Sequence, residues 1–478
     1  MIRFGTDGWR AVLAREFTFD NVGRVADAFS RFLIETSERL NGVVVSFDTR
    51  FLSERFARYF AEVVASYDIP VALSKKFTPT PALSFAVKQL KFNAGVMITA
   101  SHNPYFYNGI KFKAAYGGPV LNDFTQQIEK RLDARSPKID PLRVKKNLQE
   151  VDIVGDYFRQ IKTLLNPQSL ASFKKKMAYD AMFGCGMGFL SHFFEAFNLQ
   201  AQILHGEENP LFNRTPPEPV ARNLSELSRL IARGPFAIGL ATDGDADRCA
   251  LLDEKGQFVQ LHDLLPLLAE YLFKIRGWDG NIVRTTSMHH TIDRLMARYG
   301  KSSVEVPVGF KNVCEVMLKQ EILIGAEESG GFGFGKHLPE RDGILTLLLA
   351  LEMLGYYQAP ISALVNDLRQ RFGPFHYLRK DFYGEPELLK ANLLRLRTQP
   401  PQRVAGMPVE KVALKDGLKL YLENGTWALF RVSQTEPLAR IYVGGAELDA
   451  VKKALDWGVA QMTQKQAGKR ITQERTEA

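Results

Sequence analysis

The sequence predicts an α/β fold in several domains, followed by a smaller α+β domain. The chain has 478 residues, more than one compact core normally organises. Short β-rich apolar runs alternate with amphipathic helical patterns over most of its length, which is typical of parallel or mixed sheets covered by helices. The last ~100 residues instead show several strand patterns in succession, and their length suits one small domain.

In the first three quarters of the chain, the sequence predicts strands and helices that alternate. The strands expected there are VVVSF (43–47), AGVMITA (94–100), MAYDAMF (177–183), FAIGLA (236–241), NIVRTT (281–286) and ILIGAE (322–327). Between them, helical patterns lie at 56–67, 190–197 and 264–275. In such folds functional residues gather in loops beyond the carboxyl ends of strands, so the loops after these runs are the candidate sites.

The C-terminal region begins after RQRFGPF (369–375), which ends a helical pattern. Within it we expect a strand at 377–383, a helix near 386–397, strands at 409–414, 418–422 and 427–432, and a helix from Ala446. Two further breaks are a charged stretch at 137–150, before a helix near Asp156, and the turn DEKG at 253–256. The predicted domains are residues 1–152, 153–254, 255–370 and 371–478.

Composition and charge narrow the class of function. The 62 basic and 53 acidic residues give a net charge of +9, but the basic residues are scattered, without a nucleic-acid-binding signature. Small anionic substrates are the simplest explanation of the excess. The apolar stretch at 344–354 is too short to span a membrane and contains Glu352. Three widely spaced cysteines predict neither disulfides nor a zinc site, and no signal peptide is evident, so we expect a cytoplasmic protein.

The first candidate loop is ITASHNPYFYNGIK (98–111). Pro104 interrupts regular structure, so a tight turn presents the Ser101 hydroxyl beside His102, and Lys111 follows in the next run. A hydroxyl so placed is a candidate nucleophile or phosphoryl carrier. The alternative is an Asn-Pro turn capped by a serine and, taken alone, this loop favours that alternative.

The second candidate loop is FAIGLATDGDADRCALLDEKG (236–256), in which Asp243, Asp245 and Asp247 alternate. In an extended loop alternate side chains point the same way, so the three carboxylates are expected to converge on a divalent cation. The spacing resembles an EF-hand, but Arg248 stands where that loop needs glycine and the flanks are strand-like. Arg248 instead suits a phosphate near the metal. A solvated acidic turn is the structural alternative.

Two later loops carry groups that suit a phosphorylated sugar. In GAEESGG (325–331), Glu327 and Ser329 offer an acceptor and a donor for vicinal hydroxyls. The loop at 431–440 is rich in the donors that a phosphate dianion requires: Arg431, Ser433, Gln434, Thr435 and Arg440. Each loop alone is also compatible with an ordinary surface turn.

A hypothesis of another class is a non-catalytic protein that binds calcium or a dinucleotide. GCGMG (184–188) lies between a strand and a helix, with Glu207 about 20 residues further on, as in a dinucleotide fingerprint. The full glycine pattern is absent, so a tight turn is the better explanation. His289 and His290 are expected to cap or pack and not to bind metal.

Taken in order, the four loops resemble the α-D-phosphohexomutase superfamily. Its members carry T-A/G-S-H-N-P, D-G-D-x-D-R, G-E-x-S-G and R-x-S-x-T-E-P, and this chain has TASHNP (99–104), DGDADR (243–248), AEESGG (326–331) and RVSQTEP (431–437). Further matches are FGTDGWR (4–10), FDTR (47–50) and PVGFK (307–311). The resemblance therefore covers the whole chain.

The resemblance implies three mixed-sheet α/β domains and a smaller α+β domain, heart-shaped around a central cleft. It implies that Ser101 is a phosphoserine and that one of its oxygens holds Mg²⁺ together with Asp243, Asp245 and Asp247. The residues it implies at the transfer site are Arg10, His102, Lys111 and Arg248. The residues it implies as substrate contacts are Glu327, Ser329, Lys311, His337, Arg431, Ser433, Gln434, Thr435 and Arg440.

The sequence also departs from the family pattern. Ala11, Ala326, Gly331 and Gln434 replace residues that many members have. Arg341 stands before Asp342-Gly343, where vertebrate-type phosphoglucomutases have lysine. Because a guanidinium stays protonated, the general acid/base is open, with Lys111 and His337 as candidates.

The implied activity is that of an isomerase, a phosphosugar mutase that interconverts hexose 1-phosphate and hexose 6-phosphate through a hexose 1,6-bisphosphate. The E-E-S-G-G form resembles glucose-acting members, so glucose is the expected hexose; a phosphomannomutase or a phosphoglucosamine mutase is the alternative. We expect a monomer or dimer whose partner is a small phosphosugar, with no nucleic acid or membrane partner.

Overall fold

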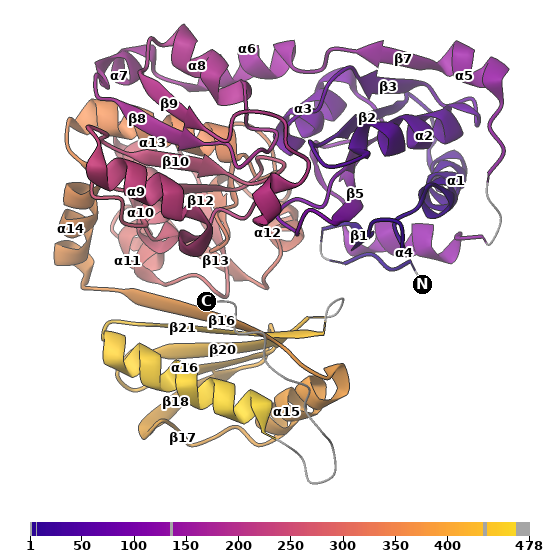
Figure 1. The fold of residues 1–478 in the computed structure, drawn as a ribbon. Coiled ribbons are helices and arrows are strands. Elements are labelled where there is room, and N and C mark those ends of the chain that lie inside the picture. Colours follow the sequence, from indigo (N-terminus) through magenta and orange to yellow (C-terminus); the bar gives the residue numbers. More distant parts are fainter. Residues whose placement is uncertain (1, 6, 134–136, 434–436, 465–478) are drawn as a thin grey trace. The chain divides into compact units, whose positions relative to one another are not determined.

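The computed structural model describes residues 2–5, 7–133, 137–433 and 437–464, and the chain divides into two compact units. The larger unit contains residues 1–284, 295–304 and 309–365; the smaller contains 285–294, 305–308 and 366–478. Four sheets are found in the described residues (Figure 1). The predicted α/β class with mixed sheets and an additional C-terminal domain is confirmed.

The first sheet has the strand order β1-β5-β4-β2-β3-β7, with β6 paired to β5. Its strands are β1 (Trp9–Val12), β2 (Val43–Phe47), β3 (Val71–Ser74), β4 (Ala94–Ile98), β5 (Tyr107–Ala114), β6 (Gly118–Pro119) and β7 (Leu148–Val151). The accompanying helices are α1 (Phe19–Thr36), α2 (Ser53–Ala65), α3 (Thr80–Leu90), α4 (Asn122–Lys130) and α5 (Pro141–Asn147). Strands β2 and β4 are parallel neighbours, so the loops after their carboxyl ends, which contain Arg50 and Ser101, start side by side.

The charged stretch at 137–150 is structured in its second half. It supplies α5 and most of β7, and β7 pairs in parallel with β3. The stretch therefore extends the first sheet and does not act as a linker. The helix expected near Asp156 follows it as α6 (Gly155–Leu164).

The second sheet has the order β11-β10-β8-β9, in which only β10 and β11 are antiparallel. Its strands are β8 (Met177–Asp180), β9 (Ala201–Leu204), β10 (Gly239–Thr242) and β11 (Cys249–Leu252). Its helices, after α6, are α7 (Pro167–Ser172), α8 (Phe189–Ala196), η1 (Phe212–Arg214), η2 (Ala221–Leu224) and α9 (Ser225–Arg233). The run expected as a strand at 236–241 forms one only from Gly239, and the run at 177–183 stops at Asp180.

The third sheet has the order β13-β12-β14-β15. Its strands are β12 (Asn281–Thr285), β13 (Ser303–Val306), β14 (Ile322–Ala326) and β15 (Phe332–Phe334). Its helices are α10 (Leu261–Lys274), α11 (Thr291–Ala297), α12 (Phe310–Met317), α13 (Gly343–Tyr357) and α14 (Ile361–Phe372). In the described part of the chain no single helix is long and apolar enough to cross a membrane; α13 and α14 pass that test only as a pair, bent by 84°.

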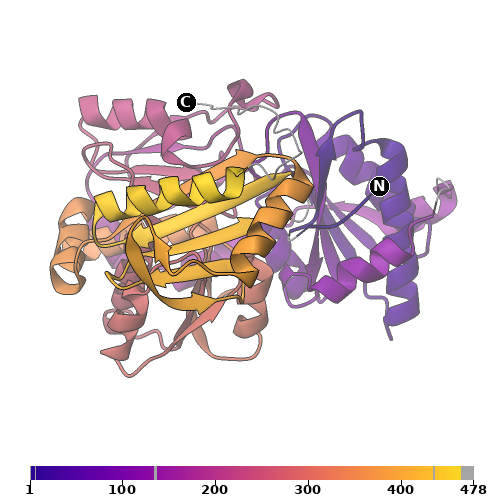
Figure 2. The ribbon, with the colours of Figure 1, turned by 90° about the horizontal axis from the view of Figure 1, so that it is seen from below.

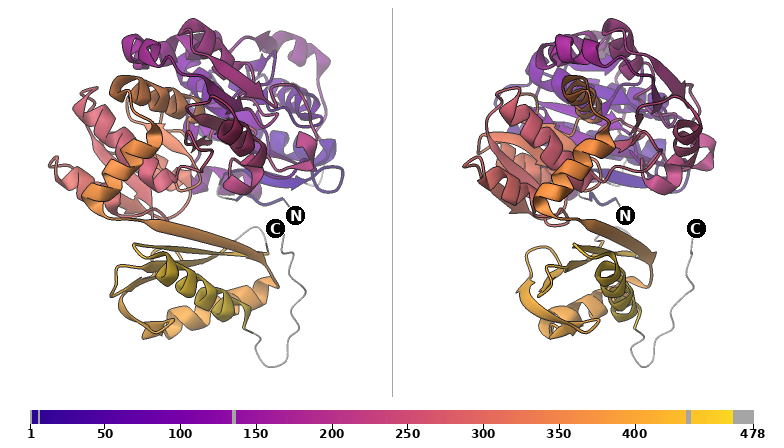
Figure 3. Two further views of the ribbon diagram at one scale, coloured as in Figure 1. Left: turned by 60° about the vertical axis from the view of Figure 1, so that its left-hand side comes forward. Right: turned by 90° about the vertical axis from the view of Figure 1, so that its left-hand side faces the viewer.

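The fourth sheet is antiparallel throughout, in the order β16-β21-β20-β19-β18-β17. Its strands are β16 (His376–Tyr383), β17 (Arg403–Val404), β18 (Met407–Ala413), β19 (Leu418–Leu422), β20 (Trp427–Val432) and β21 (Leu438–Gly445). Helices α15 (Pro386–Thr398) and α16 (Leu448–Thr463) lie along one face of it (Figure 2 and Figure 3). Their apolar side chains share one core with the strands, including Leu389, Phe430 and Val451. The sequence patterns missed β17 and β21.

Candidate active site

Ser101 lies on a tight turn after β4, as the Asn-Pro motif predicts. Its backbone is left-handed (φ 52°), and its amide donates to the Thr99 hydroxyl at 2.8 Å. The Ser101 hydroxyl donates to Asp243 Oδ2 at 2.8 Å and lies 3.3 Å from Nδ1 of His102. The turn therefore aims the hydroxyl at the acidic loop after β10, which is 142 residues away in the sequence.

Arg50 holds this turn in shape. Its guanidinium donates to the backbone carbonyl oxygens of Ser101 and Asn103, both at 2.6 Å, and to that of Pro104 at 2.9 Å. Asp48 pairs with Arg50 at 3.1 Å and accepts the Thr99 hydroxyl at 2.5 Å. Arg50 was not predicted as a site residue, although it lies in the FDTR run, which was the available signal in the sequence.

The acidic loop is a turn and not an extended segment, so the predicted geometry was wrong. Ala246 has φ 56°, and the backbone reverses between β10 and β11. The carboxylates of Asp243, Asp245 and Asp247 nevertheless converge, with one oxygen from each lying within 4.8 Å of the others. Gly244 is needed here, because a Cβ would lie 2.5 Å from the carbonyl oxygen of Ser101.

The acidic cluster fits a divalent cation. All three aspartates are fully buried, and Oδ1 of Asp245 and of Asp247 have no hydrogen-bond partner among the described residues. Burial and the two neighbouring carboxylates raise the pKa of Asp243 well above its usual value. Buried carboxylate oxygens without donors, gathered in one place, are the ligand set that Mg²⁺ prefers.

Lys111, on β5, partly balances this negative charge. Its ammonium lies 2.7 Å from Asp245, 2.9 Å from Asp247 and 3.0 Å from Asp7. Burial lowers the pKa of Lys111, but these three carboxylates outweigh burial and raise it. Burial raises the pKa of Asp245, but the charge of Lys111 and its hydrogen bond to Asp245 outweigh burial. The pKa of Asp245 is therefore lowered overall.

Arg341 joins the loop GAEESGG (325–331), predicted to bind the sugar and called the sugar loop below, to the acidic loop. Its guanidinium lies 2.5 Å from Asp7, 2.7 Å from Asp247 and 3.4 Å from Glu327. Burial raises the pKa of Glu327 to about 7, in spite of Arg341. Asp7 is a central acceptor that the sequence analysis did not single out, although it lies within the FGTDGWR motif.

The remaining predicted transfer residues lie around the same cluster. Arg10, on β1, donates to Asn103 Oδ1 at 2.7 Å, which places a second cation beside the serine turn. The amide of Arg248 donates to Asp243 Oδ1 at 3.1 Å, and its side chain lies 4.0 Å from Asp247. The larger unit thus brings together the described transfer and metal residues that the motifs predict.

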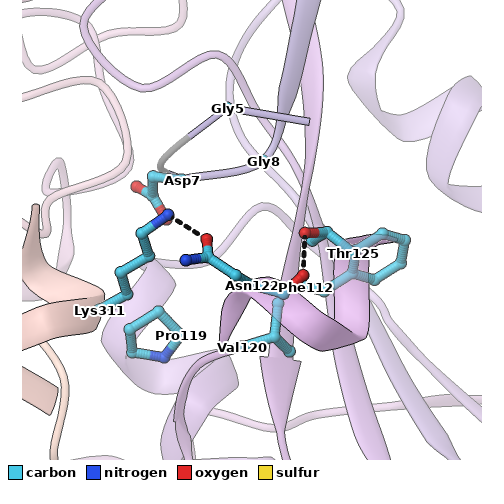
Figure 4. A pocket seen from close by; sticks show the side chains of 9 residues that line it. All are labelled: Gly5, Asp7, Gly8, Phe112, Pro119, Val120, Asn122, Thr125 and Lys311. Carbon is cyan, nitrogen blue, oxygen red and sulfur yellow. Dashed lines mark hydrogen bonds between the residues drawn. The ribbon is translucent and has the colours of Figure 1, made fainter. Parts of the chain in front are cut away.

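The predicted substrate residues of the larger unit are less closely grouped. Ser329 is half-buried in the sugar loop. Lys311 lines a small pocket with Asp7 and donates to Asn122 at 2.5 Å (Figure 4). His337 contacts Phe85, Tyr157 and Asp342 beneath α13, and its side chain is only 1% exposed. The described contacts do not bring His337 to Ser101, so its role as an acid/base stays a prediction.

In the smaller unit, the phosphate-loop residues lie at the facing ends of β20 and β21. Arg431 pairs with Asp416 at 2.8 Å, and Arg440 with Asp381 at 3.3 Å. The Ser433 amide donates to the Leu438 carbonyl at 2.8 Å and closes the loop. Gln434 and Thr435 lie outside the described residues.

The structure gives no support to the calcium or dinucleotide hypothesis. The acidic loop is flanked by strands β10 and β11, where a calcium-binding EF-hand has helices. Packing explains Gly184 and Gly186, because a Cβ would lie 2.8 Å from the Asp243 carbonyl oxygen and 2.2 Å from the Tyr179 hydroxyl, respectively. Gly188 has φ +73°, which favours glycine. His289 packs on Phe375 and contacts Thr291, as expected of a packing residue.

Comparison with known proteins places these features in one family. Profiles of phosphoglucomutase/phosphomannomutase alpha/beta/alpha domains I, II and III match residues 1–138, 155–256 and 262–372. A phosphoglucomutase/phosphomannomutase of Thermococcus kodakarensis is 26% identical over 95% of this chain and 97% of its own. A phosphoglucosamine mutase of Lachnoclostridium phytofermentans is 30% identical over 77% of this chain and 81% of its own.

A solved structure gives a more extensive match. It is that of a Thermus thermophilus protein provisionally named a phosphomannomutase, which is 36% identical, with a TM-score of 0.84 over 96% of this chain and 98% of that one. Three family domains in succession and this nearly full-length alignment agree with the motif order. The chain therefore belongs to the α-D-phosphohexomutase superfamily and is an isomerase-type phosphotransferase.

Proposed function

We propose that the protein interconverts hexose 1-phosphate and hexose 6-phosphate, with a phosphoryl group carried on Ser101. The observation that supports this most directly is the 2.8 Å hydrogen bond from the Ser101 hydroxyl to Asp243, a member of the buried acidic cluster. A hydroxyl beside a divalent-cation site and several cationic groups is what phosphoryl transfer requires. A turn with a purely structural role would need none of these groups.

The chain's own residues orient and neutralise the transferring group. In the forward step the bond between phosphorus and Ser101 Oγ breaks, and a bond from phosphorus to the sugar hydroxyl oxygen forms. That hydroxyl's proton goes to a base, and Ser101 Oγ takes up one proton and becomes the serine hydroxyl. In the return step the other phosphate of the hexose 1,6-bisphosphate moves back to Ser101. Asp243, Asp245 and Asp247 would hold Mg²⁺, which supplies positive charge to the phosphoryl oxygens when bound. Arg50 fixes the serine turn through three carbonyls, and Arg10 brings a cation to it.

The distal phosphate is assigned to the smaller unit. Arg431, Ser433 and Arg440 border one loop, with Gln434 and Thr435 between them in the sequence, and this donor set suits a dianion. Glu327, Ser329, Lys311 and His337 stay the candidates for sugar contacts. Glucose is the proposed hexose because of the E-E-S-G-G form; mannose and glucosamine phosphates are the alternatives, and the relatives' names include both.

Two measurements test the proposal: one of the phosphoryl group carried on Ser101, and one of the sugar that the enzyme prefers. Intact-mass measurement is expected to show a phosphate adduct that Ser101→Ala lacks, together with loss of nearly all turnover and an unchanged melting temperature. Ser228→Ala, which alters a serine bonded to the Gly256 carbonyl, is the matched control and should keep both adduct and turnover. Coupled assays with glucose, mannose and glucosamine 1-phosphates then rank the sugars. Normal turnover by Ser101→Ala would overturn the carrier assignment.

A cytoplasmic protein acting as a monomer or dimer on small phosphosugars remains our prediction. Size-exclusion chromatography with light scattering measures the oligomeric state directly.

A further inference from the structure

We propose that Asp416 is a positioning residue, which aims Arg431 at the distal phosphate and ties it to the loop that begins at Pro307. The inference rests on the proposed role of Arg431 in phosphate binding. Asp416 belongs to none of the four motifs. It lies in the turn at 414–417 between β18 and β19, and its partners Arg431, Thr286 and Val308 belong to the same smaller unit.

Both oxygens of the Asp416 carboxylate are engaged. Oδ1 accepts Nε of Arg431 at 2.8 Å. Oδ2 accepts the Thr286 hydroxyl at 2.9 Å and the Val308 amide at 2.7 Å. The Asp416 side chain is 11% exposed and that of Arg431 is 19% exposed, so water screens their ion pair only weakly.

The bond to Nε determines where the rest of the guanidinium points. An arginine presents five N–H donors in one rigid plane, and a phosphate is bound best by two of them side by side. Fixing Nε on Asp416 orients the terminal nitrogens of Arg431 in advance, which lowers the entropy lost on binding. The same carboxylate places a negative charge near the proposed phosphate site, and we infer that the orienting bond outweighs this repulsion.

The turn that carries Asp416 is itself firmly seated. Gly417 has φ +79°, and a Cβ there would lie 2.1 Å from the Phe430 carbonyl oxygen, so the turn packs directly on β20. Lys415 donates to the Glu305 carbonyl and Lys419 to the Thr286 carbonyl, both at 2.6 Å. Two charged side chains of the turn, Lys415 and Asp416, and one at the start of β19, Lys419, thus bind the polypeptide at the ends of β12 and β13.

The loop reached by Asp416 leads directly to the sugar loop. Val308 donates to Asp416, and the next amide, that of Gly309 in the larger unit, donates to Glu327 at 3.1 Å. Gly309 has φ 123°, which a residue with a side chain rarely adopts. Along the chain, the amide that binds Asp416, the partner of Arg431, is therefore followed directly by the amide that binds Glu327, which is proposed to contact the sugar.

The test compares Asp416→Ala and the more conservative Asp416→Asn with Glu387→Gln, which removes a carboxylate from a surface ion pair of α15. We expect KM for the hexose phosphate to rise about tenfold in Asp416→Ala, with a smaller change in kcat, because one charge-assisted orienting bond is lost. Glu387→Gln should match the wild type. Hydrogen exchange at the Val308 amide should accelerate in both Asp416 variants and not in the control.

A double-mutant cycle identifies the route of action. If Asp416 acts through Arg431, adding Asp416→Ala to Arg431→Ala should raise KM little further. Additive effects, an unchanged KM or a lowered KM in Asp416→Ala would each overturn the inference; a lowered KM would show that Asp416 competes with the phosphate. If Arg431→Ala itself binds substrate normally, the proposed phosphate role has failed. Melting temperatures identify any variant that fails to fold. If Asp416→Ala does not fold, the KM of Asp416→Asn decides whether the inference holds.

Discussion

Lys111 is enclosed by carboxylates from two distant parts of the chain. Asp7, Asp245 and Asp247 all approach it within 3.0 Å, and its side chain is 1% exposed. Buried charges are tolerated only when they are paired, and removal of one partner leaves the others uncompensated. The stability of the site in the absence of a divalent cation therefore depends on this lysine.

Lys111→Met is expected to lower the free energy of unfolding by about 3–5 kcal/mol, because the buried Asp245 and Asp247 and the partly buried Asp7 lose a cation that they share. Arg341 still pairs with Asp7 and Asp247 in the variant, so Asp245 is affected most. Excess Mg²⁺ should recover part of this loss, since it would compensate two of the same carboxylates. Denaturant unfolding with and without Mg²⁺ measures both effects. Lys319→Met, which breaks an exposed pair with Glu315, is the control and should show neither. Equal losses in the two variants would contradict the argument.

Individual residues also show which parts of the candidate site could be predicted from the sequence and which could not. Ser101 and the three aspartates lie in short motifs whose chemistry is local, so they could be predicted. Arg341 could be identified only as a departure from the family, because its partner Asp7 is 334 residues away and no local pattern encodes that contact. Arg50 lies in the FDTR run and pairs with Asp48 two residues before it. Its contacts to the serine turn are to backbone carbonyls 51 to 54 residues away, and no local pattern encodes those.

Among the secondary-structure elements, the buried strands were the most predictable. VVVSF forms a strand over its whole length, because β-branched residues fully buried on both faces leave little ambiguity. Strand β21 was missed because the residues at 431–440 were interpreted as a donor-rich loop. LARIYVGG is instead a mostly apolar run, and the strand is buried almost throughout its length. The acidic loop was expected to be extended, but a left-handed residue at Ala246 turns it back.

The ends of β8 and β9 carry a pH-sensitive contact. Nδ1 of His205 lies 2.8 Å from Asp180, and Nε2 lies 3.4 Å from Glu226 of α9. The hydrogen bond to Asp180 is the main cause that raises the pKa of His205 above 6.5. A raised folded pKa means that the stabilisation is complete below the unfolded pKa and is lost as the pH rises through the folded one.

We therefore expect His205→Gln to be less stable than the wild type below pH 6.5, with the difference shrinking as the pH rises above that value. Urea unfolding at several pH values gives the comparison. In an Asp180→Asn background the histidine has lost its main partner, so the same substitution should show much less pH dependence. A difference that grew towards high pH would refute the assignment.

For the whole molecule, the two compact units separate two parts of the proposed reaction. The described contacts of Ser101 and the metal aspartates lie in the larger unit, and those of Arg431 and Arg440 lie in the smaller. Substitutions in the smaller unit should therefore affect binding of the distal phosphate without disturbing phosphorylation of Ser101.

Arg431→Ala should raise KM for the hexose phosphate by roughly one to two orders of magnitude, because a charge-assisted hydrogen bond contributes ~1.5–3 kcal/mol. Turnover should also fall, since remote binding energy orients the reacting end. Mg²⁺ affinity, measured by calorimetry, and the phosphate adduct on Ser101 should not change. Normal substrate binding with a lost adduct would show that the loop acts on the carrier instead.

The pairing of β16 with β21 has a consequence for how the chain is made. Residues 376 and 445 are register partners, so the fourth sheet brings together the first and last strands of its region. On the ribosome, β16 emerges well before β21 and β20 just before it, although β21 lies between them in the finished sheet. Until then both expose unpaired edges, and such edges are sites of aggregation. The first sheet is complete once residue 151 has emerged, so the fourth sheet, which carries the proposed phosphate loop, completes its pairing later than the first.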